Sequence, residues 1–425
     1  MTLTVQLGKD SYDIILERGC LKKAGELLNL KRKVLVVTDD GVPQHYAETV
    51  AADQRRKGTA MKNSFGNYLS VTLFGESHGP AIGVVLDGLA PGIPVDTEFI
   101  ASQLAKRRPE GKTGTARREE DHFSILSGVF EGYTTGTPLC ITIPNEKAIS
   151  KEYSATRPLA RPGHADYTAY CKYHGFEDYR GGGHFSGRIT AALVAAGAVM
   201  IPALKQKGIV LGTHIQRLAG VEDRPFGQLE EDLETLNSQT FAVLDEAAAA
   251  RMREAILKAA AEGDSVGGLL ETAVTGLPAG LGEPWFDSME SMLSHGLFSI
   301  PAIKGVAFGD AFAMADARGS EYNDPFRMEE DRVITTSNHN GGINGGITNG
   351  MPVIFRCMVK PTPSIFKEQP TVNFMEKKDE TLNIQGRHDP AIIHRARAVV
   401  DAVTALVLAD ALTGRYGTDY LGDMK

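Results

Sequence analysis

The feature that most constrains how this chain can fold is a change of character at residues 51–60, where the polar run AADQRRKGTA separates two unlike segments. Residues 1–50 alternate β-type runs (TVQLG, YDIILERG, KVLVVTDD) with helical ones, as at the start of an α/β unit. From Met61 onward the chain carries glycine clusters such as GGGHFSG (181–187), which let backbone approach a ligand closely. We therefore expect a short partial α/β extension at 1–60 and a main domain at 61–425.

Apolar periodicity in the main domain predicts three helices, at about 187–206, 245–262 and 391–413. Between them lie short β-type runs bounded by glycine and proline, namely LETAVTGL, GVAFGDAF and PVIFRCMV. Helices and strands thus come in blocks and not in a strict βαβ rhythm. This pattern predicts an α+β fold without a Rossmann unit or a solenoid repeat.

Composition excludes several classes of protein. With 425 residues, 42% of them hydrophobic, the chain can bury a sizeable core. We find no run near the roughly 18 apolar residues of a membrane span and no signal-peptide pattern, so we expect a cytoplasmic protein. A net charge of −8 argues against a nucleic-acid binder, so an anion site must be a local basic cluster. The four cysteines lack metal-ligand spacing, and we expect no metal site.

Two histidines stand in short loops that suit acid–base chemistry. His78 follows an apolar strand in FGESHG, where flanking glycines leave its imidazole room to project. His164 lies in RPGHADYT, with Arg161 and Asp166 beside it. Asp166 could orient the ring or cap a helix. Each histidine could also be structural, because a lone histidine in a loop usually is.

Three further clusters suit the binding of anions. RRPEGKTGTARREED (107–121) is a cationic loop, and arginine forks match carboxylate and phosphate oxygens. DYRGGGHFSGR (178–188) opens a helix, whose N-terminus favours anions, but it matches neither Walker A nor GxGxxG. SNHNGGINGG (337–346), KPTPS (360–364) and GRHDP (386–390) make a plausible ligand wall. From pattern alone, solvated faces and plain turns remain open alternatives.

Taken together, the motifs resemble those of the chorismate synthase family. GESHG, RPGHAD, YRGGG-x-x-S-x-R-x-T, EGDSVGG, GLPAGLGEP, SNH-x-GGI-x-GG, KPT-x-S and GRHDP follow in that family's order and approximate spacing from Met61 to about Gly414. The resemblance implies a β-α-β-α sandwich, a homotetramer and reduced FMN as cofactor. It also implies the 1,4-anti elimination of phosphate from 5-enolpyruvylshikimate 3-phosphate, which gives chorismate in the shikimate pathway.

The resemblance also implies roles for individual residues. His78 would donate a proton to the departing phosphate, His164 would protonate or stabilise the reduced flavin, and Asp389 would work with flavin N5 to remove the C6 proton. Flavin contacts would fall on His184, Phe185, Ser186, Pro301, Ala302, Gly345, Lys360, Pro361, Thr362, Pro363, Ser364 and Arg387. The substrate's two carboxylates and phosphate would meet Arg107, Arg117, Arg188 and Arg387, since a polyanion needs fixed cations to offset lost hydration.

The sequence departs from the family pattern at two places. Many relatives have Arg-Ser-Ser where this chain has His184, Phe185 and Ser186, and Lys112 stands where relatives offer a second arginine in a longer loop. Some relatives reduce their flavin with NADPH, and others need an outside reductant. No distinct NADPH-binding insertion is present, and the sequence leaves both sources of reduction open, with NADPH as a candidate indirect reductant.

Residues 1–54 resemble the opening of a different enzyme, 3-dehydroquinate synthase, in YDIILERGCLKKAGELL and KVLVVTDDGVPQHYAETV. That enzyme's NAD loop and metal ligands do not follow, so we expect a fused or mis-joined fragment without a second activity. Two other classes stay open for the whole chain. A metal-dependent hydrolase would use the eleven histidines, although no HExxH pair occurs, and a non-catalytic scaffold would use the extension for docking.

Overall fold

The computed structural model describes residues 2–5, 12–15, 62–108, 120–146, 157–384 and 389–422. Contacts divide the chain into two units, Met1–Asn63 and Ser64–Lys425. In the first unit β1 (Thr2–Val5) pairs antiparallel with β2 (Tyr12–Ile15), as expected for the first two β-type runs. The helix and the third strand expected at 20–40 lie outside the described residues.

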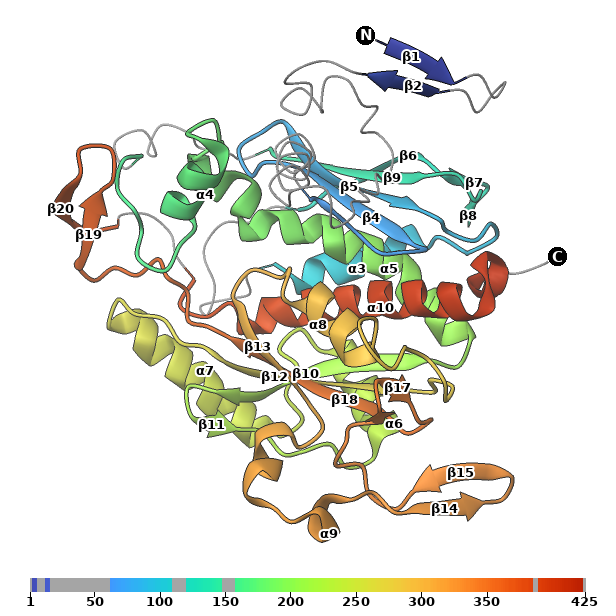
Figure 1. Cartoon of the computed structure of the whole chain (residues 1–425). Coiled ribbons are helices and arrows are strands. Elements are labelled where there is room, and N and C mark those ends of the chain that lie inside the picture. Colours follow the sequence, from blue (N-terminus) through green and yellow to red (C-terminus); the bar gives the residue numbers. More distant parts are fainter. Residues whose placement is uncertain are drawn as a thin grey trace, which may run out of the picture. The chain divides into compact units, whose positions relative to one another are not determined.

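The described part of the second unit contains two five-stranded antiparallel sheets (Figure 1). The first sheet runs in the order β3 (Ser64–Phe65), β4 (Ser70–Gly75), β5 (Ala81–Asp87), β9 (Leu139–Pro144) and β6 (Ser124–Ser127). The second runs β11 (Val221–Glu222), β10 (Val210–Leu218), β12 (Gly268–Thr275), β18 (Val353–Val359) and β13 (Ile303–Phe308). The last three of these contain the β-type runs recognised in the sequence.

Helices α3 (Thr97–Lys106), α5 (Thr190–Gln206) and α10 (Ile393–Tyr416) lie between the two sheets (Figure 1). α5 contacts the first sheet at β5 and β9, and α10 contacts the second at β10 and β12. The two helices touch closely, because a Cβ added at Gly197 would stand 2.4 Å from the Cα of Ala402. α5 is buried nearly all round, which explains why its sequence is apolar on every face.

The far face of the second sheet carries another helical layer, formed by α6 (Leu229–Ser238) and α7 (Glu246–Ala261). Neighbouring residues on a strand point to opposite faces. Gly212 of β10 approaches Leu233 of α6, whereas Thr213 donates a hydrogen bond of 2.6 Å to Asp401 of α10. The order sheet, helices, sheet, helices is a β-α-β-α sandwich of the α+β class, as expected. The other α-helices among the described residues are α4 (Asp166–Tyr173), α8 (Met289–Leu297) and α9 (Gly319–Tyr322).

Small two-stranded hairpins decorate this sandwich. They are β7 (Val129–Phe130) with β8 (Tyr133–Thr134), β14 (Phe326–Glu329) with β15 (Arg332–Thr335), β16 (Ile343–Asn344) with β17 (Ile347–Thr348), and β19 (Gln369–Asn373) with β20 (Lys378–Leu382). Short 3-10 segments occur at Arg180–Phe185, Gly187–Ile189, Ala311–Asp316 and Thr418–Leu421.

The three helices predicted from periodicity all form, with ends shifted by up to three residues. One expectation was wrong in detail. Gly187–Gln206 is long and apolar enough to cross a membrane by composition, although we expected no such run. In the fold, however, 83% of that window is buried, because α5 is the core helix between the sheets.

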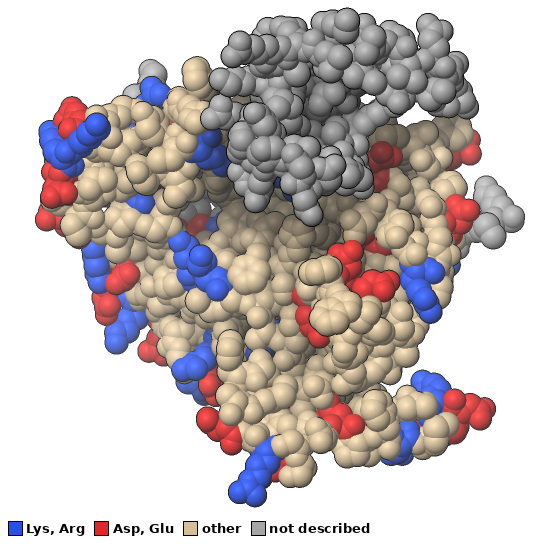
Figure 2. All heavy atoms as spheres, viewed as in Figure 1, with Lys and Arg blue, Asp and Glu red and all other residues tan. Residues whose placement is uncertain are grey.

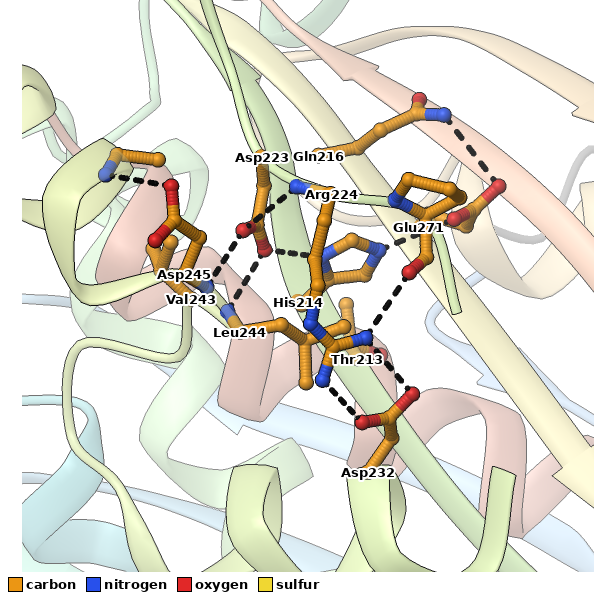
Figure 3. Close-up of polar contacts among 12 residues, drawn as sticks. Thr213, His214, Gln216, Asp223, Arg224, Asp232, Val243, Leu244, Asp245 and Glu271 are labelled. Atoms are coloured by element: carbon orange, nitrogen blue, oxygen red, sulfur yellow. Dashed lines mark hydrogen bonds and ion pairs between the residues drawn. The ribbon is translucent and has the colours of Figure 1, made fainter. Parts of the chain in front are cut away.

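A row of charged side chains crosses the second sheet, and Figure 3 shows the part of it in which His214 contacts Asp223 and Glu271. His214 of β10 stands opposite Glu271 of β12, which stands opposite Arg356 of β18. The imidazole bonds Glu271 at 3.0 Å and Asp223 at 2.7 Å, and Arg356 lies 2.7 Å from Glu271. Burial lowers the pKa of His214, but the hydrogen bonds to Asp223 and Glu271 outweigh burial and raise it. We name this row the charged ladder.

One carboxylate on α10 fixes the turn that enters the first sheet. Asp410 is buried and accepts hydrogen bonds from the backbone N–H groups of Asn67, Tyr68 and Leu69, at 2.7–3.1 Å. These three donors precede β4, whose far end leads into the FGESHG loop. The helix layer therefore fixes the strand that carries His78.

Candidate active site

His78 lies in the turn between β4 and β5, and only 8% of the residue is exposed. Its Nδ1 is 3.0 Å from the hydroxyl of Ser77, and that hydroxyl is 3.2 Å from the carbonyl oxygen of Arg180. Because a carbonyl only accepts, the hydroxyl donates to Arg180 and accepts from the Nδ1–H of His78. The ring nitrogen that gains or loses a proton is then Nε2.

His164 lies in the loop before α4 and is held by a carboxylate. Its Nδ1 is 3.0 Å from Oδ1 of Asp166. The side chain of Arg161 donates two hydrogen bonds to the same carboxylate, from Nε to Oδ2 at 2.8 Å and from an η nitrogen to Oδ1 at 2.7 Å. Burial raises the pKa of Asp166, but the hydrogen bonds from Arg161 and His164 bring it well below its usual range. Asp166 is therefore an anion that can accept a proton-bearing Nδ1.

Three consecutive glycines bring the two histidines to one place. Gly181, Gly182 and Gly183 have φ angles of 58°, 85° and 52°, in the left-handed region that favours glycine. A Cβ at Gly181 would stand 2.2 Å from Cε1 of His78, and one at Gly182 would stand 3.0 Å from Cε1 of His164. The backbone N–H of Ser77 also donates to the carbonyl of Gly183, at 3.1 Å. The glycine segment thus has His78 against one residue and His164 against the next.

Arg107 and Arg188 meet at a buried carboxylate, Asp121. Arg107 lies 3.5 Å from Oδ2, and Arg188 forms an ion pair and a hydrogen bond with Oδ1. The side chain of Arg107 also donates to the hydroxyl of Thr190 and to the carbonyl of Gly187. Two cations therefore contact one anion here, at the N-terminus of α5. Elsewhere, the face drawn in Figure 2 mixes acidic and basic side chains without one continuous basic area.

Asn145 joins the arginine cluster to the His78 loop. Its Oδ1 accepts from Nε of Arg188 at 3.1 Å, and its Nδ2 donates to the carbonyls of Glu76 and Gly79, both at 2.9 Å. The guanidinium of Arg188 also donates to the carbonyl of Pro144. Through Asn145, Arg188 therefore connects the loop that carries His78 to Asp121, the carboxylate that also contacts Arg107.

The loop Lys360–Ser364 packs beside His164. The ammonium of Lys360 donates to the carbonyl of Gly163 at 2.5 Å, and its backbone N–H donates to the carbonyl of Ala302 at 3.0 Å. A Cβ at Gly163 would lie 3.2 Å from Cβ of Pro363. The hydroxyl of Thr362 is buried and has no hydrogen-bond partner among the described residues. This loop thus presents a cation and an unused hydroxyl next to the His164 loop.

The other expected flavin-contact residues are spread more widely. His184 donates through Nδ1 to the carbonyl of Gly75 at 2.7 Å, Phe185 packs edge-on against Tyr173, and Ser186 caps the N–H of Arg188. Pro301, which is exposed, precedes Ala302, while Gly345 lies in the β16–β17 hairpin with a φ of 61°. The carbonyl of Gly346 accepts from Met289 at the start of α8, and Ala302 follows the end of α8, so these two positions lie at opposite ends of that helix.

Asp389 stands in the loop before α10, where it forms an ion pair with Arg395. The carbonyl of the next residue, Pro390, accepts from Val266 at 2.8 Å, and the neighbouring Ser265 donates to the carbonyl of Thr362 at 2.7 Å. Asp389 therefore connects to the Lys360–Ser364 loop through the 265–266 segment. The expected residues Arg117 and Arg387, and Lys112, lie outside the described residues.

Comparison with known proteins agrees with this arrangement. The family model described as chorismate synthase matches residues 69–413. Chorismate synthases of Dehalococcoides mccartyi and Pyrococcus abyssi are each 46% identical, covering 82% of this chain and 96% and 97% of their own lengths. A crystal structure of chorismate synthase superimposes with a TM-score of 0.66 at 28% identity, covering 84% of this chain and 94% of that one.

The chain belongs to the chorismate synthase family. Relatives are matched over nearly their whole length while 82% of this chain is covered, and the family model begins at residue 69. The shared sequence is therefore the two-sheet unit that carries the histidines and the arginine cluster.

Sequence reasoning missed several residues of this candidate site. Asp121 sits in the charged run RREED and was indistinguishable from a solvated residue, although it is buried between two arginines. Asn145, in the turn PNE, carried no signal at all. Ser77 stood inside GESHG beside the histidine, and its spacing could have suggested a hydrogen bond to the imidazole.

Proposed function

We infer that this chain catalyses the reaction of its family, the elimination of phosphate from 5-enolpyruvylshikimate 3-phosphate to give chorismate. In this reaction the C6–H bond and the bond between C3 and the phosphate oxygen break, and a new double bond completes the diene. One observation carries the inference: two histidines lie against adjacent glycines, and Asn145 joins the His78 loop to two arginines that both contact the buried Asp121. A substrate with two carboxylates and a phosphate needs such fixed cations.

We assign proton transfers to the residues as follows. Nε2 of His78 gives a proton to the phosphate as it leaves, while Ser77 holds Nδ1. The carboxylate of Asp389, which forms an ion pair with Arg395, accepts the C6 proton. Arg107, with Arg188, Arg117 and Arg387, binds the anionic groups of the substrate. Such acid and base groups typically contribute about 10²–10⁴-fold each.

Reduced FMN is the proposed cofactor, and when bound it would supply an electron to the substrate transiently. The donors of this chain fit an anionic cofactor: Lys360 offers an ammonium, and the buried hydroxyl of Thr362 lacks a partner among described residues. The residues that would hold FMN are His184, Phe185, Ser186, Pro301, Ala302, Gly345, Arg387 and the loop Lys360–Ser364. Because His184 already bonds the carbonyl of Gly75, we expect this segment to contact FMN mainly through backbone.

The decisive experiment measures chorismate and phosphate release under anaerobic conditions. Full-length protein with substrate and FMN reduced by dithionite is expected to form both products in equal amounts. No product under these conditions would contradict the proposed function. A parallel reaction with NADPH in place of dithionite tests whether the chain reduces its own flavin, and we expect turnover there only when an outside reductase is added.

We also propose a cytoplasmic homotetramer, as in the family. The support in this chain is an apolar face on the β14–β15 hairpin, where Phe326, Met328 and Val333 are each more than half exposed. Met328 pairs with Val333 across the hairpin, so these side chains share one face. Exposed apolar patches of this kind mark protein contacts. Light scattering of the wild type is expected to give a tetramer mass, and Met328→Glu is expected to weaken the assembly.

A further inference from the structure

The carboxylate of Asp166 makes more contacts than a helix cap would need. Oδ2 accepts from the backbone N–H of Arg161 at 3.0 Å and from its Nε at 2.8 Å, while Oδ1 accepts from an η nitrogen of Arg161 and from Nδ1 of His164. Asp166 is the first residue of α4, and no side chain makes a capping hydrogen bond at the N-cap position, which is Ala165. The side chain therefore turns back towards the loop and does not cap its own helix.

Nδ1 of His164 has two neighbours, Oδ1 of Asp166 at 3.0 Å and an η nitrogen of Arg161 at 3.1 Å. Because a carboxylate only accepts, a hydrogen bond to Asp166 needs a proton on Nδ1, whereas a bond from Arg161 would need none. The Arg161 fork prevents the carboxylate from rotating away, and the backbone N–H of His164 donates to the carbonyl of Arg161 at 3.0 Å. The ring is thus held at both its backbone and its side chain, with Nε2 towards Gly182, whose added Cβ would lie 3.4 Å from it.

We propose that Asp166 is a positioning residue that fixes the tautomer and orientation of His164 and offsets the positive charge of Arg161 beside the ring. The proposal deepens the proposed function and rests on it only for the step in which His164 acts during turnover. Carboxylate–imidazole pairs do the same in other active sites, where the acid orients the ring without itself becoming protonated. The charged groups that face the ring are Asp166, Arg161 and, through the carbonyl of Gly163, Lys360.

A matched control exists elsewhere in the chain. Asp232 of α6 accepts from both η nitrogens of Arg224 and from the backbone N–H of Gly227, at distances of 2.5–3.1 Å. It therefore has the same arginine fork and backbone donor as Asp166, but no histidine in the described part of the chain forms a hydrogen bond with it. Asp232→Asn removes an equivalent carboxylate–arginine pair far from the proposed reaction.

The first measurement needs neither cofactor nor substrate. Diethyl pyrocarbonate modifies neutral imidazole, so the rate of modification of His164 against pH, read by peptide mass spectrometry, reports its protonation. In Asp166→Asn the pH of half-maximal reactivity is expected to fall by about one unit, because a nearby anion favours the charged ring. Asp232→Asn is expected to leave the His164 profile unchanged. An unmoved profile in Asp166→Asn, or an equal shift in both variants, would overturn the proposal.

The second measurement is turnover. Asp166→Asn is expected to lower kcat by about 10- to 100-fold with little change in KM, and to move the pH–rate limb in the same direction as the modification profile. In the His164→Ala background, Asp166→Asn is expected to add nothing, because the two changes remove one shared function. A further loss of similar size in that background would sink the positioning role.

Two safeguards separate the possible failures. If the wild type makes no chorismate, the proposed function fails, but the modification profile of His164 still decides whether Asp166 controls the ring. If Asp166→Asn does not fold, Asp166→Glu replaces it, since it keeps the charge but displaces the carboxylate by one methylene. That variant is expected to lose kcat while keeping the wild-type modification profile, and wild-type kcat in it would reject the proposal.

Discussion

At the scale of single residues, the candidate site depends on which side chains can transfer a proton and on the space that the glycine segment leaves for them. His78, His164 and Asp389 come from three separate loops, and the histidines lie against neighbouring glycines. We expect His78→Ala, His164→Ala and Asp389→Asn each to lower kcat by about 10²–10⁴-fold in a folded protein. Measured with C6-deuterated substrate, Asp389→Asn alone should show a larger isotope effect, because proton removal becomes more rate-limiting. Wild-type turnover in any of the three removes that residue from the mechanism.

The second residue-scale prediction concerns Gly181. An alanine there meets two obstacles: a left-handed φ of 58° and a Cβ placed 2.2 Å from His78. Gly208 has a similar φ of 78°, but its added Cβ meets nothing within 4 Å, so Gly208→Ala measures backbone strain alone. Both variants should lose about 1–2 kcal/mol of stability in urea unfolding. Only Gly181→Ala should also lose turnover, and equal kcat in the two variants would show that His78 adapts.

Only part of this site could be predicted from the sequence. The histidines and glycines could be recognised because they stand in short motifs whose members are close in the chain. The bond between Asp121 and Arg188 spans 67 positions, and that between Asn145 and Arg188 spans 43. No local pattern encodes such pairs, because the sheet and α5 must assemble before the side chains meet.

At the scale of elements, α5, α7 and α10 were predictable because their apolar periodicity is local and long. Their layering was not, since it depends on close approach at small residues such as Gly197 against Ala402. The polar residues buried within α10 were equally hidden. Apolar periodicity places His394 and Thr404 in the helix but cannot show that both are buried without hydrogen-bond partners among the described residues.

His394 gives an element-scale prediction with a defined pH window. Burial lowers its pKa to about 3, helped by Arg395 and Arg253, so the folded protein holds the ring neutral. Between pH 6.5 and about 3 the unfolded chain binds this proton and the folded chain does not, so stability falls as pH drops. His394→Leu should remove this loss. The free energy of unfolding of His394→Leu minus that of the wild type should be about 2 kcal/mol larger at pH 5 than at pH 7.

Thr404→Val is the matched control for that experiment. Thr404 is fully buried on the same helix, and its hydroxyl also lacks a partner in the described part of the chain, but it does not titrate. Its replacement should change the free energy of unfolding by a similar amount at both pH values. Urea unfolding at pH 5 and pH 7 gives all four differences. A pH-independent effect of His394→Leu would mean that the imidazole becomes hydrated when it is charged.

At the scale of the whole molecule, the question is which residues the enzyme needs. The family model begins at residue 69, and the contact division falls between Asn63 and Ser64. We predict that a chain beginning at Met61 folds and keeps near-full turnover. Thermal unfolding and chorismate formation, compared with the full chain, test this. Loss of solubility or of activity would show that residues 1–60 belong to the working protein, whatever their resemblance to 3-dehydroquinate synthase.

The charged ladder of the second sheet has a consequence for how this sequence can drift. Glu271 is a partner of both His214 and Arg356, but Asp223 still pairs with His214 when Glu271 is replaced, so the replacement leaves Arg356 without a carboxylate partner among the described residues. Replacing Arg356 alone is less severe, because His214 still compensates the carboxylate of Glu271. Neutral evolution should therefore reach a ladder without Glu271 only after Arg356 has gone. Among relatives, losses at 271 should be found nested within lineages that already lack Arg356.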